Sequence, residues 1–343
     1  MNQGVPSDPL ATPDFFPMKI DVQRNTIQFV QMSRDSFRRS VFLDRRAVVS
    51  GSTTLTAAIP QLLRRRAERP MHFILHGAFC GSTLLTRYLE DLPYCFVLRE
   101  PGVLGQLAGM RHTMPAEAYT ESWEQCLRAT FTLLARAYAT DAAVIVKPAD
   151  LCNWMGNLLL DHDASTKIVF LNAPLKVFLL QVLKAEDRRR WVRAHIQAQA
   201  LRRPMALVPF LAAIVAADLT DGQCAAAMWL LNSFLCRSLL ARRDSHRVIA
   251  VNGEDLADRP EPTVRAVADF LGLADDEVSR TALDRLHPSS THAKDGQVPY
   301  DATARASVLA DAEARYAAEM QAALSWAHTL AAGWLDQCPF PIA

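Results

Sequence analysis

The sequence lacks a strong net charge of either sign, because its 343 residues include 37 Lys and Arg against 36 Asp and Glu. Proteins that bind nucleic acid over a broad face normally carry a clear basic excess, so we expect no nucleic-acid partner. Long apolar runs are also missing. The longest, residues 205–217, contains Pro209 and stops at Asp218, well short of the ~18 residues that a membrane-spanning helix needs. We therefore expect no membrane partner.

Paired cysteine and histidine spacings are absent as well. The seven cysteines are scattered singly, without any CxxC, which is typical neither of a disulfide framework nor of a zinc site. The histidines show no metal-ligand spacing, so we expect no metal. The first residues lack the basic start and apolar core of a secretory signal. Reduced thiols and a cytoplasmic location are the interpretation that these absences favour.

Half of the residues are hydrophobic, and five short apolar runs stand out among them. They alternate with helical patterns, and runs such as IVF and VIV are continuously apolar. Strands that are buried on both faces have this pattern, which indicates a parallel sheet with helices on both sides. The sequence therefore predicts an α/β, P-loop-type three-layer fold with roughly five parallel strands flanked by helices. The predicted strands are residues 71–77, 95–101, 142–148, 166–173 and 246–252.

Two regions organise the predicted fold. Residues 1–70 are expected to form a hairpin and helices packed on the core, with the hairpin turn at Arg24-Asn25 and a helix over residues 55–70. Residues 71–343 are expected to form the α/β domain, with a helical insertion at 186–243 that is broken near Pro204 and at residues 220–222. Asp150 stands where it would cap the helix that follows the third strand.

A glycine-containing loop follows the first predicted strand, in the segment FILHGAFCGSTLL. Gly77 and Gly81 allow a tight turn, and the unpaired amides of the loop and of the next helix form an anion site suited to phosphate. Ser82 and Thr83 add hydroxyl groups. The loop is not a Walker A motif, because Ser82 stands at the lysine position. The same residues would also suit a plain strand–turn–helix.

Several blocks of the sequence carry a family resemblance. Gly81-Ser82-Thr83-Leu84-Leu85 is similar to the second half of the phosphosulfate-binding loop of sulfotransferases, and the segment 248–273, with EDL, Pro260 and FLGL in order, is similar to the family's late strand and helix. The chain most resembles a bacterial branch of sulfotransferase-like P-loop proteins. The resemblance implies 3′-phosphoadenosine-5′-phosphosulfate as co-substrate, without metal. It implies that the donor is held by Gly77, Ala78, Phe79, Cys80, Gly81, Ser82 and Thr83.

The sequence departs from the family at three positions that normally contact the donor. Phe79 replaces the loop's Lys or Arg, and Asn172 and Leu180 stand where an Arg and a Ser grip the 3′-phosphate. A buried phosphate without cations or donors is costly, so other residues must take over or the donor differs. The candidate replacements are Lys147, Lys176, the Arg188–Arg193 cluster and Lys294.

Sulfuryl transfer also needs a group that accepts the acceptor's proton and a group that stabilises the leaving oxygen. Glu100, at the end of the second strand, is the predicted general base. The alternative is that Glu100 only pairs with Arg99 or another arginine. Lys147 or His76 would protonate or neutralise the bridging oxygen, although His76 would also suit a packed position at the strand end.

The predicted function is that of a sulfotransferase-like transferase, which moves a sulfuryl group to a hydroxyl or amine of a small molecule or peptide. One alternative is an ATP-dependent P-loop kinase or other group transferase, against which the missing Walker lysine weighs. Another is a non-catalytic binding protein on the same scaffold. The small-molecule or peptide acceptor is the expected partner, together with a possible homodimer.

Overall fold

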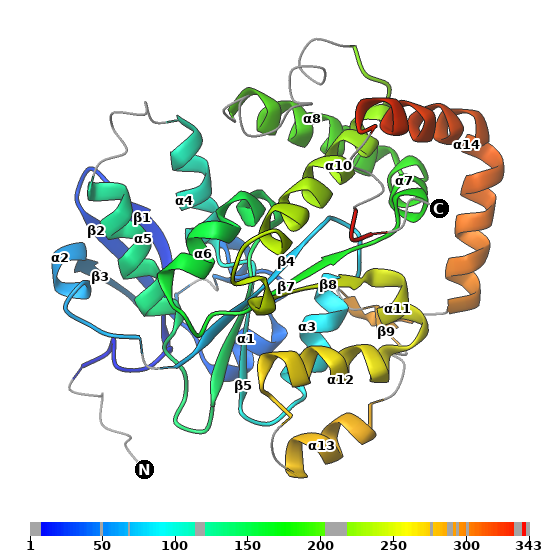
Figure 1. Ribbon diagram of the computed structural model, residues 1–343. Coiled ribbons are helices and arrows are strands. Elements are labelled where there is room, and N and C mark those ends of the chain that lie inside the picture. Colours follow the sequence, from blue (N-terminus) through cyan, green and yellow to red (C-terminus); the bar gives the residue numbers. More distant parts are fainter. Residues whose placement is uncertain are drawn as a thin grey trace. The chain divides into compact units, whose positions relative to one another are not determined.

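The computed structural model (Figure 1) describes the chain in two compact units. Unit 1 comprises Met1–Leu75, Thr83–Ile168 and Val264–Leu286, and unit 2 comprises His76–Ser82, Val169–Thr263 and His287–Ala343. The described residues are 8–48, 51–67, 69–113, 121–202, 218–274, 277–286, 291–292, 295–299, 302–332 and 338–340.

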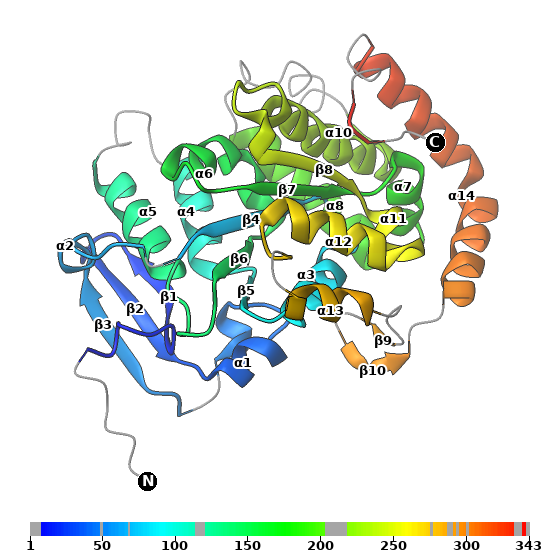
Figure 2. The same ribbon diagram turned by 60° about the horizontal axis from the view of Figure 1, so that its bottom comes forward.

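Five strands form one sheet in the order β5-β6-β4-β7-β8, and they can be followed in Figure 2. Every residue of the four strands β4 to β7 is buried, whereas the edge strand β8 is mostly half-buried. This burial explains the continuous apolar runs, because both faces of the inner strands are covered. The predicted α/β class, with a five-stranded parallel sheet flanked by helices, is confirmed. The strands are β4 (Met71–His76), β5 (Cys95–Arg99), β6 (Ala143–Lys147), β7 (Ile168–Asn172) and β8 (Val248–Asn252).

An antiparallel sheet of three strands forms the N-terminal part of unit 1. The predicted hairpin is confirmed, since Asp21 pairs with Thr26 around a turn in which Asn25 takes a φ of 51°. Asparagine tolerates this left-handed conformation better than most residues do. The strands are β1 (Phe15–Asp21), β2 (Thr26–Gln31) and β3 (Thr54–Ala58).

The helix predicted over residues 55–70 is wrong. Thr54–Ala58 is a strand that pairs with β2, and among the described residues of this segment only α2 (Ile59–Leu62) is helical. Pro60 lies in the first turn of α2, where its missing N–H is harmless, but it could not lie inside a longer helix. The predicted capping role of Asp150 is also wrong. Asp150 lies in the first turn of a 3-10 helix, Asp150–Met155, whose N-cap is Ala149 without a side-chain hydrogen bond.

The other helices of unit 1 connect and cover its strands. In unit 1, β4 and β6 run parallel with Met71 opposite Val144, and β5 and β6 with Arg99 opposite Lys147. The parallel pairing brings the carboxyl ends of β5 and β6 together. The helices that lie wholly or mostly in unit 1 are α1 (Arg34–Arg39), the 3-10 turn Arg45–Ala47, α3 (Ser82–Glu90), α4 (Gly102–Thr113), α5 (Glu121–Leu134), α6 (Gly156–His162), α12 (Pro260–Leu271) and α13 (Glu277–Asp284).

Unit 2 has a helical core in which α10 packs against α7, α8 and α14. Thr220 caps α10 and exchanges hydrogen bonds with Gln223 in a capping box, which confirms the predicted helix break at 220–222. The predicted break near Pro204 lies outside the described residues. Trp229, fully buried in α10, donates from Nε1 to the Ala173 carbonyl at 2.8 Å. The elements are α7 (Leu175–Leu183), α8 (Glu186–Arg202), α10 (Asp221–Leu240), the 3-10 turn Ser245–Arg247, α11 (Gly253–Asp258), β9 (Thr291–His292), β10 (Asp295–Pro299) and α14 (Ala302–Leu330).

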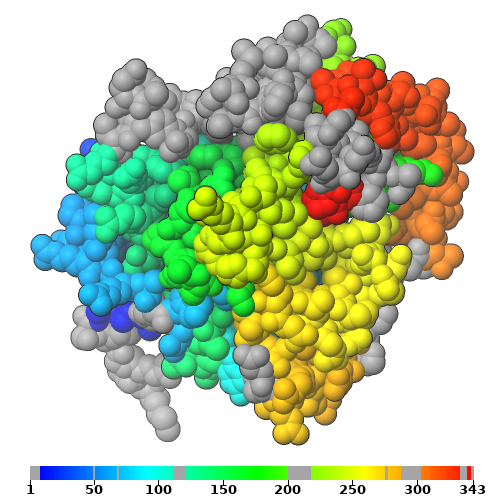
Figure 3. Space-filling model, in the orientation of Figure 1, coloured from blue at the N-terminus to red at the C-terminus, as the bar shows by residue number. Residues whose placement is uncertain are grey.

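Helix α14 buries only a narrow stripe of small and apolar side chains. Ala312, Met320, Ala323 and Ala327 are buried at roughly helical spacing, while most of its other residues are exposed, as Figure 3 shows in orange and red. Within the part of the chain that the structure describes, no helix is long and apolar enough to cross a membrane. The division at residue 70 and the helical insertion at 186–243 as a domain feature stay predictions.

Candidate functional site

The loop Gly77–Gly81 links β4 to α3 and belongs to unit 2. Its backbone takes two left-handed conformations, at Phe79 with a φ of 58° and at Gly81 with a φ of 88°. Glycine adopts such a φ without strain, but for a bulky residue such as phenylalanine it is a true outlier, of the kind that collects at functional sites. The Gly77 N–H donates to the Leu171 carbonyl at 2.9 Å, which fixes the start of the loop to β7.

Two glycines allow other backbone and side chains to approach the loop closely. A Cβ at Gly77 would lie 2.2 Å from Asn172 Oδ1, and a Cβ at Gly253 would lie 2.3 Å from the Cys80 carbonyl oxygen. Neither position can hold a larger residue unless its neighbour moves. The Cys80 thiol donates to the Gly77 carbonyl at 2.9 Å and closes the turn from inside.

Several amides of the loop remain available to a ligand. Among the described residues, the backbone N–H groups of Ala78, Phe79 and Gly81 have no hydrogen-bond acceptor. The first turn of α3 follows them, and its N–H groups are unpaired by the geometry of a helix start. Ser82 and Thr83, both buried, begin that turn. Unpaired amides that converge on a helix N-terminus form a cradle for a phosphate or similar anion.

Arg188 places a cation beside Phe79, the loop residue that stands where the sequence lacks a Lys or Arg. Its guanidinium lies 4.6 Å from the centre of the Phe79 ring, which also contacts Phe178 and Trp191. Arg188 Nη1 donates to the backbone and side-chain oxygens of Gln181, both at 2.9 Å. Burial lowers the pKa of Arg188 from its usual value, although an arginine keeps its charge. No carboxylate among the described residues forms an ion pair with Arg188.

Lys184, which the sequence analysis missed, lies beside Arg188. Burial, together with the charges of Arg188 and Arg305, lowers the pKa of Lys184 to about 8. Its ammonium has no hydrogen bond or ion pair within the described part of the chain, so three cations here repel one another with little to neutralise them. Arg305 alone has an acidic partner, Glu254, at 2.5 Å. The i,i+4 spacing of Lys184 and Arg188 was the sequence pattern that could have indicated a paired cation site. A lysine at the end of a helix, however, is usually explained by its favourable interaction with the helix dipole.

The other cations predicted to replace the missing ones already have acidic partners. Lys176 pairs with Glu313 at 2.7 Å, and Arg190 pairs with Glu186 at 3.5 Å. Asp221 pairs with both of the remaining arginines of the Arg188–Arg193 cluster, Arg189 and Arg193. A role for Lys176 in donor binding stays a prediction, as does that of Asn172, whose Oδ1 accepts from the Ala173 N–H at 3.0 Å. Lys294 lies outside the described residues.

Glu100 and Lys147 form a buried ion pair in unit 1. Lys147 Nζ lies 2.6 Å from Glu100 Oε1, and the two side chains are 1% and 19% exposed. The Glu100 N–H also donates to the Lys147 carbonyl at 2.6 Å, and Glu100 takes a strained φ of 50°. The parallel register of β5 and β6 brings Glu100 and Lys147 together, because Arg99 stands opposite Lys147 and Glu100 follows Arg99 at the end of β5.

Glu100 forms the ion pair that the alternative expected, but with Lys147 and not with Arg99, and the charge of Glu100 also acts on Arg46. Arg99 instead pairs with Glu90 at 3.0 Å and is fully buried among backbone carbonyls. In the described chain, Glu100 Oε2 has no hydrogen-bond partner, so one carboxylate oxygen remains available to accept a proton.

His76, at the end of β4, is 6% exposed, and its Nδ1 donates to the Gly77 carbonyl at 2.9 Å. This hydrogen bond suits a packed strand-end histidine, and a catalytic role stays a prediction. No group of three His, Cys, Asp or Glu side chains that could hold a metal occurs among the described residues.

Comparisons with known proteins give only distant likenesses. No family model matches the chain, and no curated protein matches it. Solved structures that it is similar to include a sulfotransferase from Alicyclobacillus acidocaldarius, with 17% identity, 74% of this chain and 96% of that chain covered, and a TM-score of 0.39. A sulfotransferase from Mycobacterium avium has 11% identity, with 75% and 79% covered and a TM-score of 0.36. The sulfotransferase domain from the curacin biosynthetic pathway has 13% identity, with 68% and 83% covered and a TM-score of 0.37. TM-scores this low assign neither a shared site nor an activity.

Proposed function

We propose that the chain is a sulfotransferase-like transferase that moves a sulfuryl group from 3′-phosphoadenosine-5′-phosphosulfate to a hydroxyl or amine. The observation that carries the proposal is the loop Gly77–Gly81, with its unpaired amides and a half-buried Arg188 that has no ion pair with a described carboxylate and lies over the Phe79 ring. The loop amides would hold one anionic group of the donor, and Arg188, beside Phe79, would hold the other. That the donor is 3′-phosphoadenosine-5′-phosphosulfate is implied by the resemblance of the loop and of segment 248–273 to sulfotransferases.

The donor molecule has two separate anionic groups, and the described residues offer hydrogen-bond donors for both. We assign the phosphosulfate to the amides of Ala78, Phe79 and Gly81 and to the first turn of α3. We assign the 3′-phosphate to Lys184 and Arg188, with Arg305 nearby. Three cations without full neutralisation are unfavourable in the free protein, and a bound dianion would relieve their repulsion. The cations that the family carries at the positions of Phe79 and Asn172 would thus be replaced from α7 and α8.

We assign the proton transfer to Glu100. In the proposed step, the acceptor oxygen or nitrogen attacks sulfur, the bond from sulfur to the bridging oxygen breaks, and the electron pair stays on the leaving phosphate oxygen. Glu100 Oε2 takes the proton of the attacking group. Lys147, whose Nζ lies 2.6 Å from Glu100 Oε1, holds the Glu100 side chain in place, and it is the group that we propose favours negative charge on the leaving oxygen. His76 remains the second proposed donor to that oxygen.

The test is a calorimetric titration with adenosine 3′,5′-bisphosphate, with two arginine variants of α8. Arg188→Met removes the cation at Phe79, and we expect its affinity to fall about tenfold or more, the size of a lost charge-assisted hydrogen bond. Arg190→Met is the matched control, because Arg190 lies on the same helix with a side chain 74% exposed and paired with Glu186. Equal affinities of the two variants would contradict the assignment.

ATP separates the competing functions. Binding of ATP that requires magnesium, with no binding of the bisphosphate, would favour a kinase. Binding of the bisphosphate without transfer of labelled sulfate to any acceptor would favour a non-catalytic binding protein. The possible homodimer and the cytoplasmic location stay proposals.

A further inference from the structure

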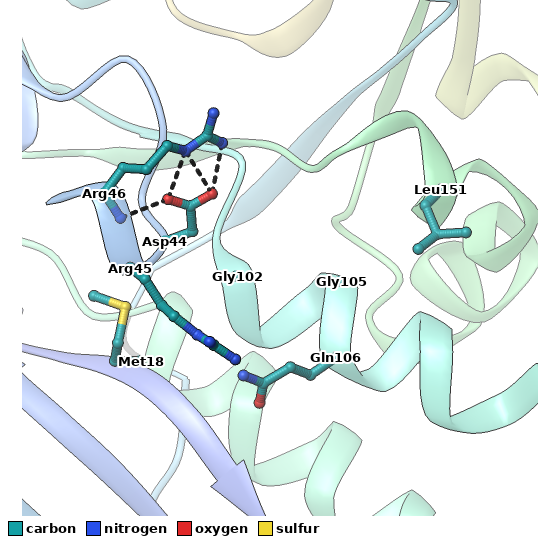
Figure 4. Close-up of a pocket in the computed structure, with 8 residues that line it drawn as sticks. All are labelled: Met18, Asp44, Arg45, Arg46, Gly102, Gly105, Gln106 and Leu151. Carbon is teal, nitrogen blue, oxygen red and sulfur yellow. Dashed lines mark hydrogen bonds and ion pairs between the residues drawn. The ribbon is translucent and has the colours of Figure 1, made fainter. Parts of the chain in front are cut away.

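A pocket of about 430 Å³ lies within unit 1, beside the residues that follow Glu100 (Figure 4). It is formed by the 3-10 turn Arg45–Ala47, the first turns of α4, and Leu151 in the segment after β6. Met18 and Leu151 contribute apolar surface. A cavity of this size falls in the range of ~300 to 1,000 Å³ that is typical of small-molecule sites.

Hydrogen bonds fasten the pocket to the Glu100 segment. The Leu43 N–H donates to the Arg99 carbonyl at 2.7 Å, and the Gly102 N–H donates to the Leu43 carbonyl at 2.8 Å. The pocket wall at Asp44 is therefore attached to the chain on both sides of Glu100. Leu151 follows Lys147, the partner of Glu100, by one short turn of chain.

The two arginines of the pocket differ in their partners. Arg46 is neutralised, because its guanidinium forms a two-pronged ion pair with Asp44, with Nη2 at 2.6 Å from Oδ2, and it stacks on Phe42 at 3.9 Å. Arg45 has neither an ion pair nor a hydrogen bond from its side chain among residues that the structure describes. The charged residues that line the pocket are two arginines and one carboxylate, so its lining carries a net positive charge, although the charge of Arg45 also acts on Asp44.

Gln106 places a second donor opposite Arg45. Its Oε1 accepts from the Ile20 N–H at 2.8 Å, which orients the amide and leaves Nε2 as a donor without a described acceptor. Figure 4 shows Arg45 and Gln106 pointing toward one another across the pocket. Two donors, one of them charged, face the same space with no acceptor drawn between them, which suits an oxyanion.

We propose that this pocket binds the acceptor substrate, and that Arg45 and Gln106 hold an acidic group on it. The acceptor would then be a small hydroxyl or amine compound that also carries a carboxylate, with its apolar part against Met18 and Leu151. That the bound compound is the acceptor of the sulfuryl group rests on the proposed function. The binding of an acidic compound in this pocket does not depend on sulfuryl transfer. Binding is therefore measured without any donor.

The probes are 4-hydroxybenzoate and its uncharged analogue 4-hydroxybenzamide, titrated calorimetrically into the full chain. Arg45→Met removes the cation. Gly105→Leu fills the pocket, because a Cβ at Gly105 meets nothing within 4 Å and the change raises helix propensity. Gly109→Leu is the matched control, since Gly109 is a turn further along α4, has the same open space at its Cβ, and does not line the pocket.

We expect the acid to bind the wild-type chain and the Gly109→Leu variant equally, and the Gly105→Leu variant not at all. Arg45→Met should weaken the acid about tenfold, as expected for a charge-assisted hydrogen bond, and leave the amide unchanged. Equal binding of acid and amide, or full binding by Gly105→Leu, would overturn the inference. Binding as expected without sulfuryl transfer would overturn the proposed function alone, whereas transfer to neutral acceptors only would overturn the pocket alone.

Discussion

Replacement of Lys147 by methionine tests the buried ion pair from which the proposed catalysis starts. Lys147→Met keeps a side chain of similar length and leaves Glu100 without its partner. Glu100→Met is the reciprocal variant, and the double variant removes both charges. Because Lys147 is 1% exposed and Glu100 is 19% exposed, the two single variants leave very different charges behind.

The magnitudes follow from this asymmetry. At the 2.6 Å separation of Nζ and Oε1, two unit charges attract by about 6 kcal/mol at an effective dielectric constant of about 20, and desolvation offsets much of this. Breaking a buried pair typically costs about 3 to 5 kcal/mol of the free energy of unfolding. Lys147→Met should fall near the lower value, because Glu100 regains contact with water. Glu100→Met should fall near the upper value, because it leaves an ammonium buried and unpaired.

The free energies of unfolding of the wild-type chain and the three variants, measured with urea, form a double-mutant cycle. We expect the double variant to be more stable than Glu100→Met, because an apolar pair replaces an isolated buried charge. Two results would refute the reasoning. One is that the losses in the free energy of unfolding simply add. The other is that Lys147→Met costs more than Glu100→Met.

Three further predictions concern groups whose surroundings the structure describes. His72 accepts a hydrogen bond from the Lys167 N–H at 3.1 Å, and burial lowers the pKa of His72 to about 4. At about 1.36 kcal/mol per pKa unit, about 3 kcal/mol of the free energy of unfolding should be present above pH ~6.5 and lost as the pH falls through about 4. A His72→Asn variant whose stability kept the same dependence on pH would contradict this. Burial and neighbouring cations lower the pKa of Lys184 to about 8, so the affinity for adenosine 3′,5′-bisphosphate should fall as the pH rises through that value, and Lys184→Met should show a flat calorimetric profile there. Gly77→Ala brings a Cβ to 2.2 Å from Asn172 Oδ1 and should lower the thermal midpoint, and adding Asn172→Ala should restore much of the loss unless the clash lies elsewhere.

Much of the fold could be predicted because inner parallel strands leave a strong mark in the sequence. Residues such as Val169 and Ile145 have no exposed face, so their strands are continuously apolar, and the loop glycines mark where β4 ends. The segment 55–70 could not be predicted in the same way. Its strand, Thr54–Ala58, is defined by pairing with β2, and that long-range contact leaves no local pattern in an alanine-rich stretch.

The site was only partly predictable for a related reason. Glu100 and Lys147 were found because each ends a predicted strand, but their mutual pairing required the register of β5 and β6. Which arginine of α8 stays free of a carboxylate depended on the position of Asp221, which pairs with Arg193 and not with Arg188. Cations that look equivalent in the sequence differ in the structure, because carboxylates from distant segments pair with some of them and not with others.

The most direct test of the central claim is transfer of radiolabelled sulfate from 3′-phosphoadenosine-5′-phosphosulfate, measured without magnesium on hydroxyl and amine acceptors with a carboxylate group. We predict a labelled product with the wild-type chain and with the Arg190→Met control, and a product reduced about a hundredfold or more with Glu100→Gln, as expected for loss of a general base. Labelled product at an undiminished rate with Glu100→Gln would contradict the role of that residue. No labelled product from the wild-type chain, with the bisphosphate bound or not, would contradict the proposed activity itself.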